Sequence, residues 1–446
     1  MFGVGLPLAY VFLTAFEYVG AFIYLVPGYS HLRIDGSLYL LSREYTVETV
    51  AAGITLTVLG LAAFVAGVCL ARPRRRAVAA LDLSSALCTG ARSRCWRLNM
   101  NELHLIGAFA FVMAFIVPRL QLPIPMLNVI NLAAANAAVV YICLGFHQSL
   151  TFTRTTLPYW CTLIVLLVLY YLIVNGFASF GFAAIMIIAA FALVRILPGK
   201  SGPIRILGVG FLALYSLLTL FTAWMSGRIA FRSVIWSDAS IASRIDALRN
   251  TLAEMRLLSP SDFATLDFLA GRLNQGMYVG KMIENHASYE QSFYWGRTLL
   301  LAAIAWIPRP LWPSKPTAGG SQLISEQTKL VFADDVTFGS GPIMEFYANF
   351  GTIGVLLGMA SLGALIAVFD RKAGMAFSQG RTLTVILWFT AGVACIRPLS
   401  ELFFIVNALV ATILIFWTIR QILSLEHSRR PLTDSARHSS DASHRT

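Results

Sequence analysis

Ten apolar segments, most of them about as long as a membrane-spanning helix, constrain the fold of this chain more than any other feature. They cover residues 3–27, 47–71, 102–118, 123–146, 158–174, 176–197, 204–225, 342–369, 382–398 and 399–419. Only 13% of the residues are charged, against about 25% in an ordinary soluble domain. Backbone polar groups inside a bilayer must be hydrogen-bonded internally, so such segments are interpreted as helices. The sequence therefore predicts an all-α, polytopic integral membrane protein with about ten transmembrane helices, in a range of ten to twelve.

Basic residues beside the apolar segments predict the orientation of the chain. Between the second and third segments, seven arginines face a single acidic residue, Asp82. Cytoplasmic loops concentrate Lys and Arg in this way, so we place this loop in the cytoplasm and the protein in the inner membrane, with both termini cytoplasmic. The net charge of +12 is then a topology signal and gives no support for a nucleic-acid partner. The first segment follows no basic run, so we expect a span and not a signal peptide.

The longest polar stretch, residues 226–342, is predicted to be one large periplasmic loop that binds substrate. It holds 11 Lys and Arg and 10 Asp and Glu, a mixture typical of a folded surface. Apolar residues recur at helical spacing in "IASRIDALRNTLAEMRLL", which predicts short amphipathic helices near the membrane face. Seven spans precede the loop in residues 1–225, and three follow it in residues 343–420. Residues 421–446 are polar and are predicted to be a disordered cytoplasmic tail.

Inside this loop lies a short apolar patch, "LLLAAIAWI", at residues 299–307. The patch is too short to cross the membrane as a helix. A crossing here would also place Arg371 and Lys372 outside, against the positive-inside rule. We therefore predict a re-entrant or interfacial segment.

The loop also carries a row of cations near the predicted membrane face. Excess positive charge on the translocated side is unusual, and a phosphate-bearing ligand would account for it, because guanidinium groups bind phosphate oxygens in pairs. The candidates for binding a substrate pyrophosphate are Arg228, Arg232, Arg272, Arg309 and Lys315. A plainer interpretation is that these residues pair with nearby acids, and that Arg228 and Arg232 contact lipid headgroups.

Four prolines stiffen the segment "WIPRPLWPSKPTAGG" at residues 306–320. They hold Arg309, Trp312 and Lys315 between them. An indole beside two cations suits a sugar ring next to a phosphate, and an aromatic anchor in the membrane interface is an equally good interpretation. The candidates for stacking on sugar faces are Trp306, Trp312 and Tyr347.

Two residues are candidates for moving a proton. Glu345 lies at the start of a span in "GPIMEFYANFG", where an ionisable side chain is costly unless it lines a wet cavity or binds a partner. His286 is the only histidine in the long loop, and an imidazole titrates near neutral pH. A lone loop histidine is more often an ordinary surface residue. Glu345 is therefore the first candidate for a catalytic base and His286 the second.

The sequence lacks the motifs of several enzyme classes. It has no Walker loop, no dinucleotide-binding glycine pattern, no HExxH and no Asp-rich cluster. All six cysteines lie outside the long loop, so no disulfide framework is predicted there. ATP hydrolysis, redox cofactors and metal catalysis therefore have no support, and we predict neither a cofactor nor a metal site.

Three motifs together resemble a known family. "GRLNQG", "IPRPLWPSKP" and "FGSGPIMEFYANFGTIGVLLG" are similar to segments of the Wzy-type polymerases, which join oligosaccharide repeat units of bacterial surface polysaccharides such as O-antigen. The motif likeness covers residues 267–358, and the layout of spans around one large loop is similar over the whole chain. The arginine that many members carry in a middle span has no counterpart around Ser179. The positions that match are Arg272, Asn274, Arg309, Trp312, Lys315, Glu345, Asn349 and Gly351.

The resemblance implies a metal-independent membrane glycosyltransferase, GT-C-like in layout. It would transfer a growing glycan from undecaprenyl pyrophosphate to a new lipid-linked repeat unit on the periplasmic face of the bacterial inner membrane. The implied partners are the undecaprenyl-pyrophosphate-linked oligosaccharide, membrane lipids, a chain-length regulator and a flippase. Two other functions remain open: a lipid-linked glycan (O-antigen) ligase, which differs only in its acceptor, and a flippase or carrier for the same lipid-linked sugar.

Overall fold

The structure, a computed structural model, describes residues 3–24, 46–71, 98–120, 127–173, 178–195, 263–288, 291–307, 311–315, 321–330 and 339–429, together with parts of 211–259. Three of the predicted phosphate-binding residues, Arg228, Arg232 and Arg309, lie outside the described residues, as do residues 430–446 of the predicted tail. Every regular element in the described part of the chain is a helix, in agreement with the all-α prediction.

The described helices follow the apolar segments closely. Those of the first half are α1 (Leu6–Tyr24), α3 (Val47–Leu70), α5 (Met100–Phe111), α6 (Leu127–Phe152), α7 (Leu157–Ile173) and α8 (Ala178–Arg195). A π-helical turn, Val112–Ile116, continues α5, and the described residues between 211 and 224 are helical. The loop contains α10 (Ile241–Ala253), α11 (Phe263–Arg272), α12 (Gln275–Ala287), α13 (Arg297–Ala303) and α14 (Ser321–Thr328). The last helices are α15 (Gly341–Ser378), α16 (Thr382–Cys395) and α17 (Leu402–Arg429).

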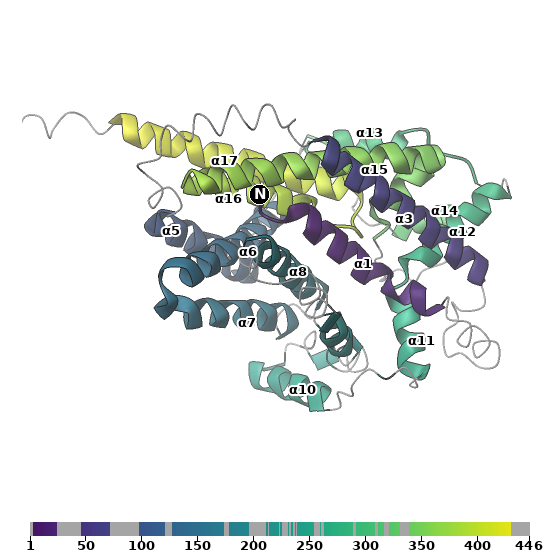
Figure 1. Cartoon of the computed structure of the whole chain (residues 1–446), viewed down its shortest axis with the longest axis horizontal. Coiled ribbons are helices and arrows are strands. Elements are labelled where there is room, and N and C mark those ends of the chain that lie inside the picture. Colours follow the sequence, from purple (N-terminus) through teal and green to yellow (C-terminus); the bar gives the residue numbers. More distant parts are fainter. Residues whose placement is uncertain are drawn as a thin grey trace, which may run out of the picture.

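Five of the described helices are long and apolar enough to cross a membrane. The membrane-spanning candidates are Leu6–Ile23, Val47–Leu70, Ile130–Phe152, Gly341–Ser378 and Leu402–Ile419. Three further apolar helices are shorter: Met100–Ile116, Gly181–Arg195 and Thr382–Cys395. Figure 1 shows α15, α16 and α17 lying together, with α5 to α8 as a neighbouring group. The molecule is therefore a bundle of apolar helices of the kind found in helical membrane proteins.

At one end of the bundle, helix ends from distant parts of the sequence are hydrogen-bonded to one another. The Asp370 carboxylate near the end of α15 accepts backbone N–H groups from Val4 and Leu6, both at 2.9 Å, where α1 begins. Arg371 donates to the carbonyl of Ala71 at 2.8 Å, where α3 ends. This end therefore gathers the start of α1 and the ends of α3 and α15.

The opposite end of the bundle carries the described helices of the long loop. The backbone N–H of Gly20 in α1 donates to the carbonyl of Leu273, directly after α11, at 2.8 Å. Thr49 at the start of α3 donates to Glu284 of α12 at 3.0 Å. The helices of the loop are thus attached where α1 ends and α3 begins.

One loop helix, α12, is packed inside the fold. Its first residues are buried against α3. The approach is so close that a Cβ added to Gly53 would lie 1.9 Å from the carbonyl oxygen of Gly276, and one added to Gly280 would lie 1.8 Å from that of Thr49. Glycines spaced four apart on one helix allow backbone contact of this kind, as in helix pairs within membranes.

The predicted re-entrant patch forms a helix that cannot cross a bilayer. Helix α13 has seven residues and is therefore about 10 Å long, at 1.5 Å per residue. It ends at Ala303 and turns follow, while α13 packs on α17 and α15. The helix in the segment 299–307 is therefore too short to be a span by itself.

The last helix is longer than predicted, because α17 continues to Arg429. Residues 421–429, assigned from the sequence to the disordered tail, are therefore helical. The segment "QILSLEHSR" still contains good helix formers, and Pro431 disfavours helical geometry at the residue before it.

Candidate active site

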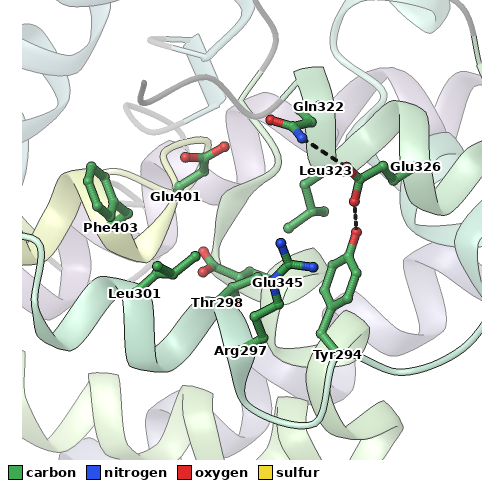
Figure 2. A pocket seen from close by; sticks show the side chains of 10 residues that line it. All are labelled: Tyr294, Arg297, Thr298, Leu301, Gln322, Leu323, Glu326, Glu345, Glu401 and Phe403. Carbon is green, nitrogen blue, oxygen red and sulfur yellow. Dashed lines mark hydrogen bonds between the residues drawn. The ribbon is translucent and has the colours of Figure 1, made fainter. Parts of the chain in front are cut away.

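A cavity of about 180 Å³ lies at the loop end of the bundle (Figure 2). Its walls come from four separate segments: the loop before α13 with α13 itself, helix α14, the first turns of α15, and the turn between α16 and α17. The lining residues are Tyr294, Arg297, Thr298, Leu301, Gln322, Leu323, Glu326, Glu345, Glu401 and Phe403. Three carboxylates and one guanidinium therefore meet in one small space.

A single buried amide, Asn349, fixes the loop before α13 to helix α15. Its Oδ1 accepts the backbone N–H of Gly296 at 2.9 Å, and its Nδ2 donates to the Thr298 hydroxyl at 2.6 Å and to the carbonyl of Glu345 at 2.7 Å. The backbone N–H of Tyr294 adds a hydrogen bond to the carbonyl of Ala348 at 2.8 Å. Because Asn349 is fully buried, these bonds are protected from competing water.

Helix α15 is broken directly after Asn349, at Phe350 and Gly351. Gly351 adopts φ +63° and ψ −152°, a conformation that is open essentially to glycine alone, and Phe350 is also non-helical. A Cβ on Gly351 would also lie 3.3 Å from the ring of Phe293. The glycine of "ANFG" therefore allows the break, and the break separates the segment that carries Glu345 from the rest of α15.

Glu345 is 2% exposed. Its side chain accepts a hydrogen bond from α17 and also lines the cavity. One carboxylate oxygen, Oε2, accepts the backbone N–H of Leu402 at 2.7 Å, at the first residue of α17. A carboxylate there satisfies an N–H group that has no partner within its own helix, and it lies at the positive end of the helix dipole. The same side chain lines the cavity, so it joins α15 to α17 and also faces the cavity.

Tyr294 and α14 form the opposite wall. The Tyr294 hydroxyl donates to Glu326 Oε2, and Gln322 donates to the other oxygen of Glu326 at 2.9 Å. Burial, together with the neighbouring Glu326 carboxylate, raises the pKa of Tyr294 to about 12. Tyr294 therefore stays protonated at physiological pH and remains a hydrogen-bond donor.

Arg297 is the cation of the cavity. Its guanidinium points into the space between Tyr294 and Glu345 in Figure 2. It forms no ion pair with a carboxylate among the residues that the structure describes. Since three glutamates oppose this one arginine, the cavity is acidic. An acidic lining suits a ligand rich in hydroxyl donors, such as a sugar, better than a pyrophosphate alone.

The other described residues of the predicted pyrophosphate site lie outside this cavity. Arg272 is half-buried at the end of α11, close to Tyr278. Lys315 donates to the carbonyls of Ala305 and Ile307, which follow the end of α13, and its ammonium lies 5.3 Å from the ring centre of Phe403. Lys315 thus folds the proline-rich segment back onto α13. The structure does not bring Arg272 and Lys315 into the carboxylate cavity.

His286, the second candidate base, also lies outside the cavity lining. Its Nε2 is 2.7 Å from the amide oxygen of Gln327, and its ring stacks on Phe293 with 4.4 Å between ring centres. Tyr347, a predicted sugar-stacking residue, is buried in the same aromatic group, 5.7 Å from the His286 ring. In this structure both residues pack the wall behind the cavity.

Trp306 and Trp312, the two predicted tryptophans, are more accessible. Trp306 is half exposed and Trp312 is partly exposed, and neither lines the cavity. Trp295, Leu300 and Leu311 on the same segment are also exposed. Tryptophans on an apolar surface of this kind are typical of the membrane interface.

Four ionisable residues of the cavity lining were not among the site residues chosen from the sequence. Arg297, Glu326 and Glu401 appear in the sequence only as members of longer rows of charged residues, and Tyr294 gave no signal. They come from different segments, so only the tertiary fold groups them. No group of three His, Cys, Asp or Glu side chains in the described ranges is placed to hold a metal ion.

The chain matches the model of one protein family, described as a domain of unknown function (DUF8712), over residues 8–428. It belongs to this family. No curated protein and no solved structure matches the chain.

Proposed function

We propose that this member of the DUF8712 family is a polysaccharide repeat-unit polymerase of the bacterial inner membrane. It transfers a growing glycan from undecaprenyl pyrophosphate to a new lipid-linked repeat unit at the periplasmic face. The observation that carries the proposal is the cavity around Glu345. The motif "GPIMEFYANFG" is part of the resemblance to the Wzy-type polymerases. It supplies the candidate base Glu345, the amide Asn349 that fixes the loop before α13, and the helix break at Gly351.

The chemistry follows from the residues around the cavity. A hydroxyl oxygen of the acceptor sugar attacks the anomeric carbon of the donor glycan, and a new C–O bond forms. The bond from that carbon to the phosphate oxygen breaks, and the pyrophosphate leaves with the bonding electrons. Glu345 takes the proton of the attacking hydroxyl, because the carboxylate faces the cavity while its Oε2 is held by Leu402.

The remaining cavity residues position the substrates. Glu401 and Glu326 accept hydrogen bonds from sugar hydroxyls, and Tyr294 holds Glu326 in place by donating its hydroxyl hydrogen to Oε2. Arg297 stabilises the charge that develops at the leaving oxygen, since a fixed cation is most effective where negative charge appears in the transition state. The loop arginines Arg228, Arg232 and Arg309 stay candidates for the rest of the pyrophosphate.

A topology of ten spans is part of the proposal. The start of α1 and the ends of α3 and α15 meet at one bundle end, together with Arg371 and Lys372, as the positive-inside rule requires of a cytoplasmic side. The loop helices and the cavity occupy the opposite end, which is then periplasmic. The shorter apolar helices count as spans, because bilayers thin locally around short segments.

A carrier for the same lipid-linked sugar is the second candidate function. One observation favours it: Glu17 and Arg397 line a larger cavity among the helices of the bundle. A carrier needs charged groups of this kind along a path through the membrane. A ligase has the same layout as a polymerase and differs only in the acceptor that receives the glycan.

The three functions give different surface polysaccharides in a deletion strain. Single repeat units on the surface mean that a polymerase is missing, no polysaccharide at the surface means a missing flippase, and long polymers that stay on the lipid carrier mean a missing ligase. We expect single units, and we expect the purified protein to form a ladder from lipid-linked repeat units alone. A purified, folded protein that forms no product longer than the starting unit would overturn the proposal.

A further inference from the structure

A second cavity, of about 430 Å³, lies between the helices on the other side of the turn from α16 to α17. Its volume is in the range of about 300–1,000 Å³ that is usual for ligand sites. Most of the wall is apolar and comes from α1, α6, α8 and the π turn after α5. The polar residues of the lining are Glu17, Asn136, Tyr170, Tyr171, Arg397 and Ser400.

Arg397 gives this cavity an anion-binding group with unused donors. One terminal nitrogen, Nη2, reaches the Asn136 side-chain oxygen at 3.5 Å, and the guanidinium lies 5.2 Å from the ring centre of Phe404. The Arg397 Nε and the Asn136 Nδ2 are buried and have no hydrogen-bond partner. Buried donors are rarely left unsatisfied in proteins, so two of them at one cavity wall point to a ligand that accepts hydrogen bonds.

The turn that carries Arg397 also borders the carboxylate cavity. Residues 396–400 line the larger cavity, and Glu401 lines the smaller one. The turn is fixed in place by close packing on the first residue of α15, because a Cβ on Gly341 would lie 2.2 Å from the carbonyl oxygen of Pro398. A ligand held at Arg397 is thus separated from the carboxylate cavity by a few residues of chain.

We propose that the larger cavity binds an amphiphile with a phosphate or pyrophosphate head and an isoprenoid chain. This is a second lipid-linked molecule, separate from the donor whose pyrophosphate is assigned to Arg297. Its head lies at Arg397 and Asn136, and its chain lies along the apolar wall formed by residues such as Leu13, Val139 and Ile187. A guanidinium matches phosphate oxygens, and its charge in a buried site requires a counter-charge. Glu17 also lines the cavity but forms no ion pair with Arg397 within 4 Å. The choice of an isoprenoid rests on the proposed function.

The test is a binding measurement with purified, full-length protein in detergent. The probes are farnesyl pyrophosphate, inorganic pyrophosphate and farnesol. Their binding is measured by calorimetry and by the shift of the protein's unfolding temperature. We expect farnesyl pyrophosphate to bind at least tenfold more tightly than either fragment. Equal binding of pyrophosphate would mean a site for free anions, and equal binding of farnesol would mean an apolar site. Either result overturns the inference.

Variants tie the binding to this cavity. Arg397→Gln should weaken farnesyl pyrophosphate binding by about tenfold to a hundredfold, the scale of a charge-assisted hydrogen bond, and Arg397→Lys should lose less. Arg154→Gln, at an exposed residue between α6 and α7, is the matched control and should bind like the wild type. If Arg397→Gln does not fold, Val139→Phe narrows the cavity from its apolar wall and should also reduce binding.

Wild-type affinity in folded Arg397→Gln or Val139→Phe protein would overturn the inference. Because the assay requires no glycan transfer, it separates the two proposals. Binding by a protein that makes no polymer would remove the polymerase function alone. Polymer synthesis by a protein that does not bind the probe would remove this site alone.

Discussion

Replacing Glu345 by glutamine separates the two things that this side chain does. The amide has nearly the same size and can still accept the backbone N–H of Leu402 through its oxygen, so the connection between α15 and α17 persists. What changes is the charge, because a charge-assisted hydrogen bond becomes a neutral one. That exchange costs about 1 kcal/mol of stability, since bonds to ionised groups are roughly twice as strong as neutral ones. The variant should therefore fold.

Catalysis should suffer far more than stability. An amide cannot take the proton of the acceptor hydroxyl, and the loss of a general base typically costs on the order of a hundredfold or more in rate. A hundredfold corresponds to about 2.7 kcal/mol of barrier, at 1.36 kcal/mol for each factor of ten. The assay follows the ladder formed by purified protein from lipid-linked repeat units, with and without a chelator. Glu284→Gln is the matched control, because Glu284 is a glutamate outside the cavity whose side chain is 51% exposed.

Two results would refute this reasoning about Glu345. Full activity of Glu345→Gln would mean that the residue only joins two helices, and the proton acceptor would have to be sought at Glu401 or, as the sequence suggested, at His286. Loss of activity accompanied by loss of folded protein would mean that the capping role had been underestimated. Glu345→Ala measures that role, because it removes the acceptor for Leu402 as well as the charge.

Three further predictions test the local geometry and the topology. Gly351→Ala should destabilise the detergent-solubilised protein by about 1–3 kcal/mol because of its positive φ, whereas Gly271→Ala, at a helical position with open space, should not, as unfolding curves will show. Tyr294→Phe should lose about 1 kcal/mol at neutral pH. The folded-state pKa of Tyr294 is raised from 10.0 to about 12, so ionisation of the hydroxyl should remove this stability difference as the pH rises from about 10 to about 12. Thermal unfolding curves of the wild type and Tyr294→Phe should therefore converge at alkaline pH. Reporter fusions should read periplasm at Gly319 and cytoplasm at Arg371; a cytoplasmic signal at Gly319 would end the ten-span topology.

Glu345 could be selected from the sequence because a carboxylate at the start of an apolar segment is itself unusual. An ionisable side chain is costly to bury there unless it has a partner or lines a wet cavity, and the structure places Glu345 at a cavity wall. The apolar segments were equally readable, because the length and hydropathy of a span are local properties. The role of Gly351 could not be predicted from the local sequence, because nothing local distinguishes a glycine that breaks a helix from one inside it. Only the resemblance drew attention to it.

The rest of the cavity depends on tertiary structure. Arg297, Glu326 and Glu401 are separated by tens of residues, and each looks in the sequence like an ordinary charged residue near a helix end. The burial of α12 was missed for a related reason. Its packing depends on Gly276 and Gly280 meeting Gly53 of α3, a complementarity between two segments that no single segment reveals.

The break in α15 links the sequence motif to the proposed chemistry. Helix α15 has 38 residues, which at 1.5 Å per residue would extend about 57 Å, well beyond the roughly 30 Å of hydrocarbon. Non-helical backbone is tolerated at membrane depth only where protein satisfies its polar groups, and Asn349 and the loop before α13 cover this break. The part after Gly351 is long enough to span by itself, and in the proposed topology the part before it, with Glu345, then lies at the outer surface. There the hydrogen bond from the backbone N–H of Leu402 holds the Glu345 side chain against the start of α17.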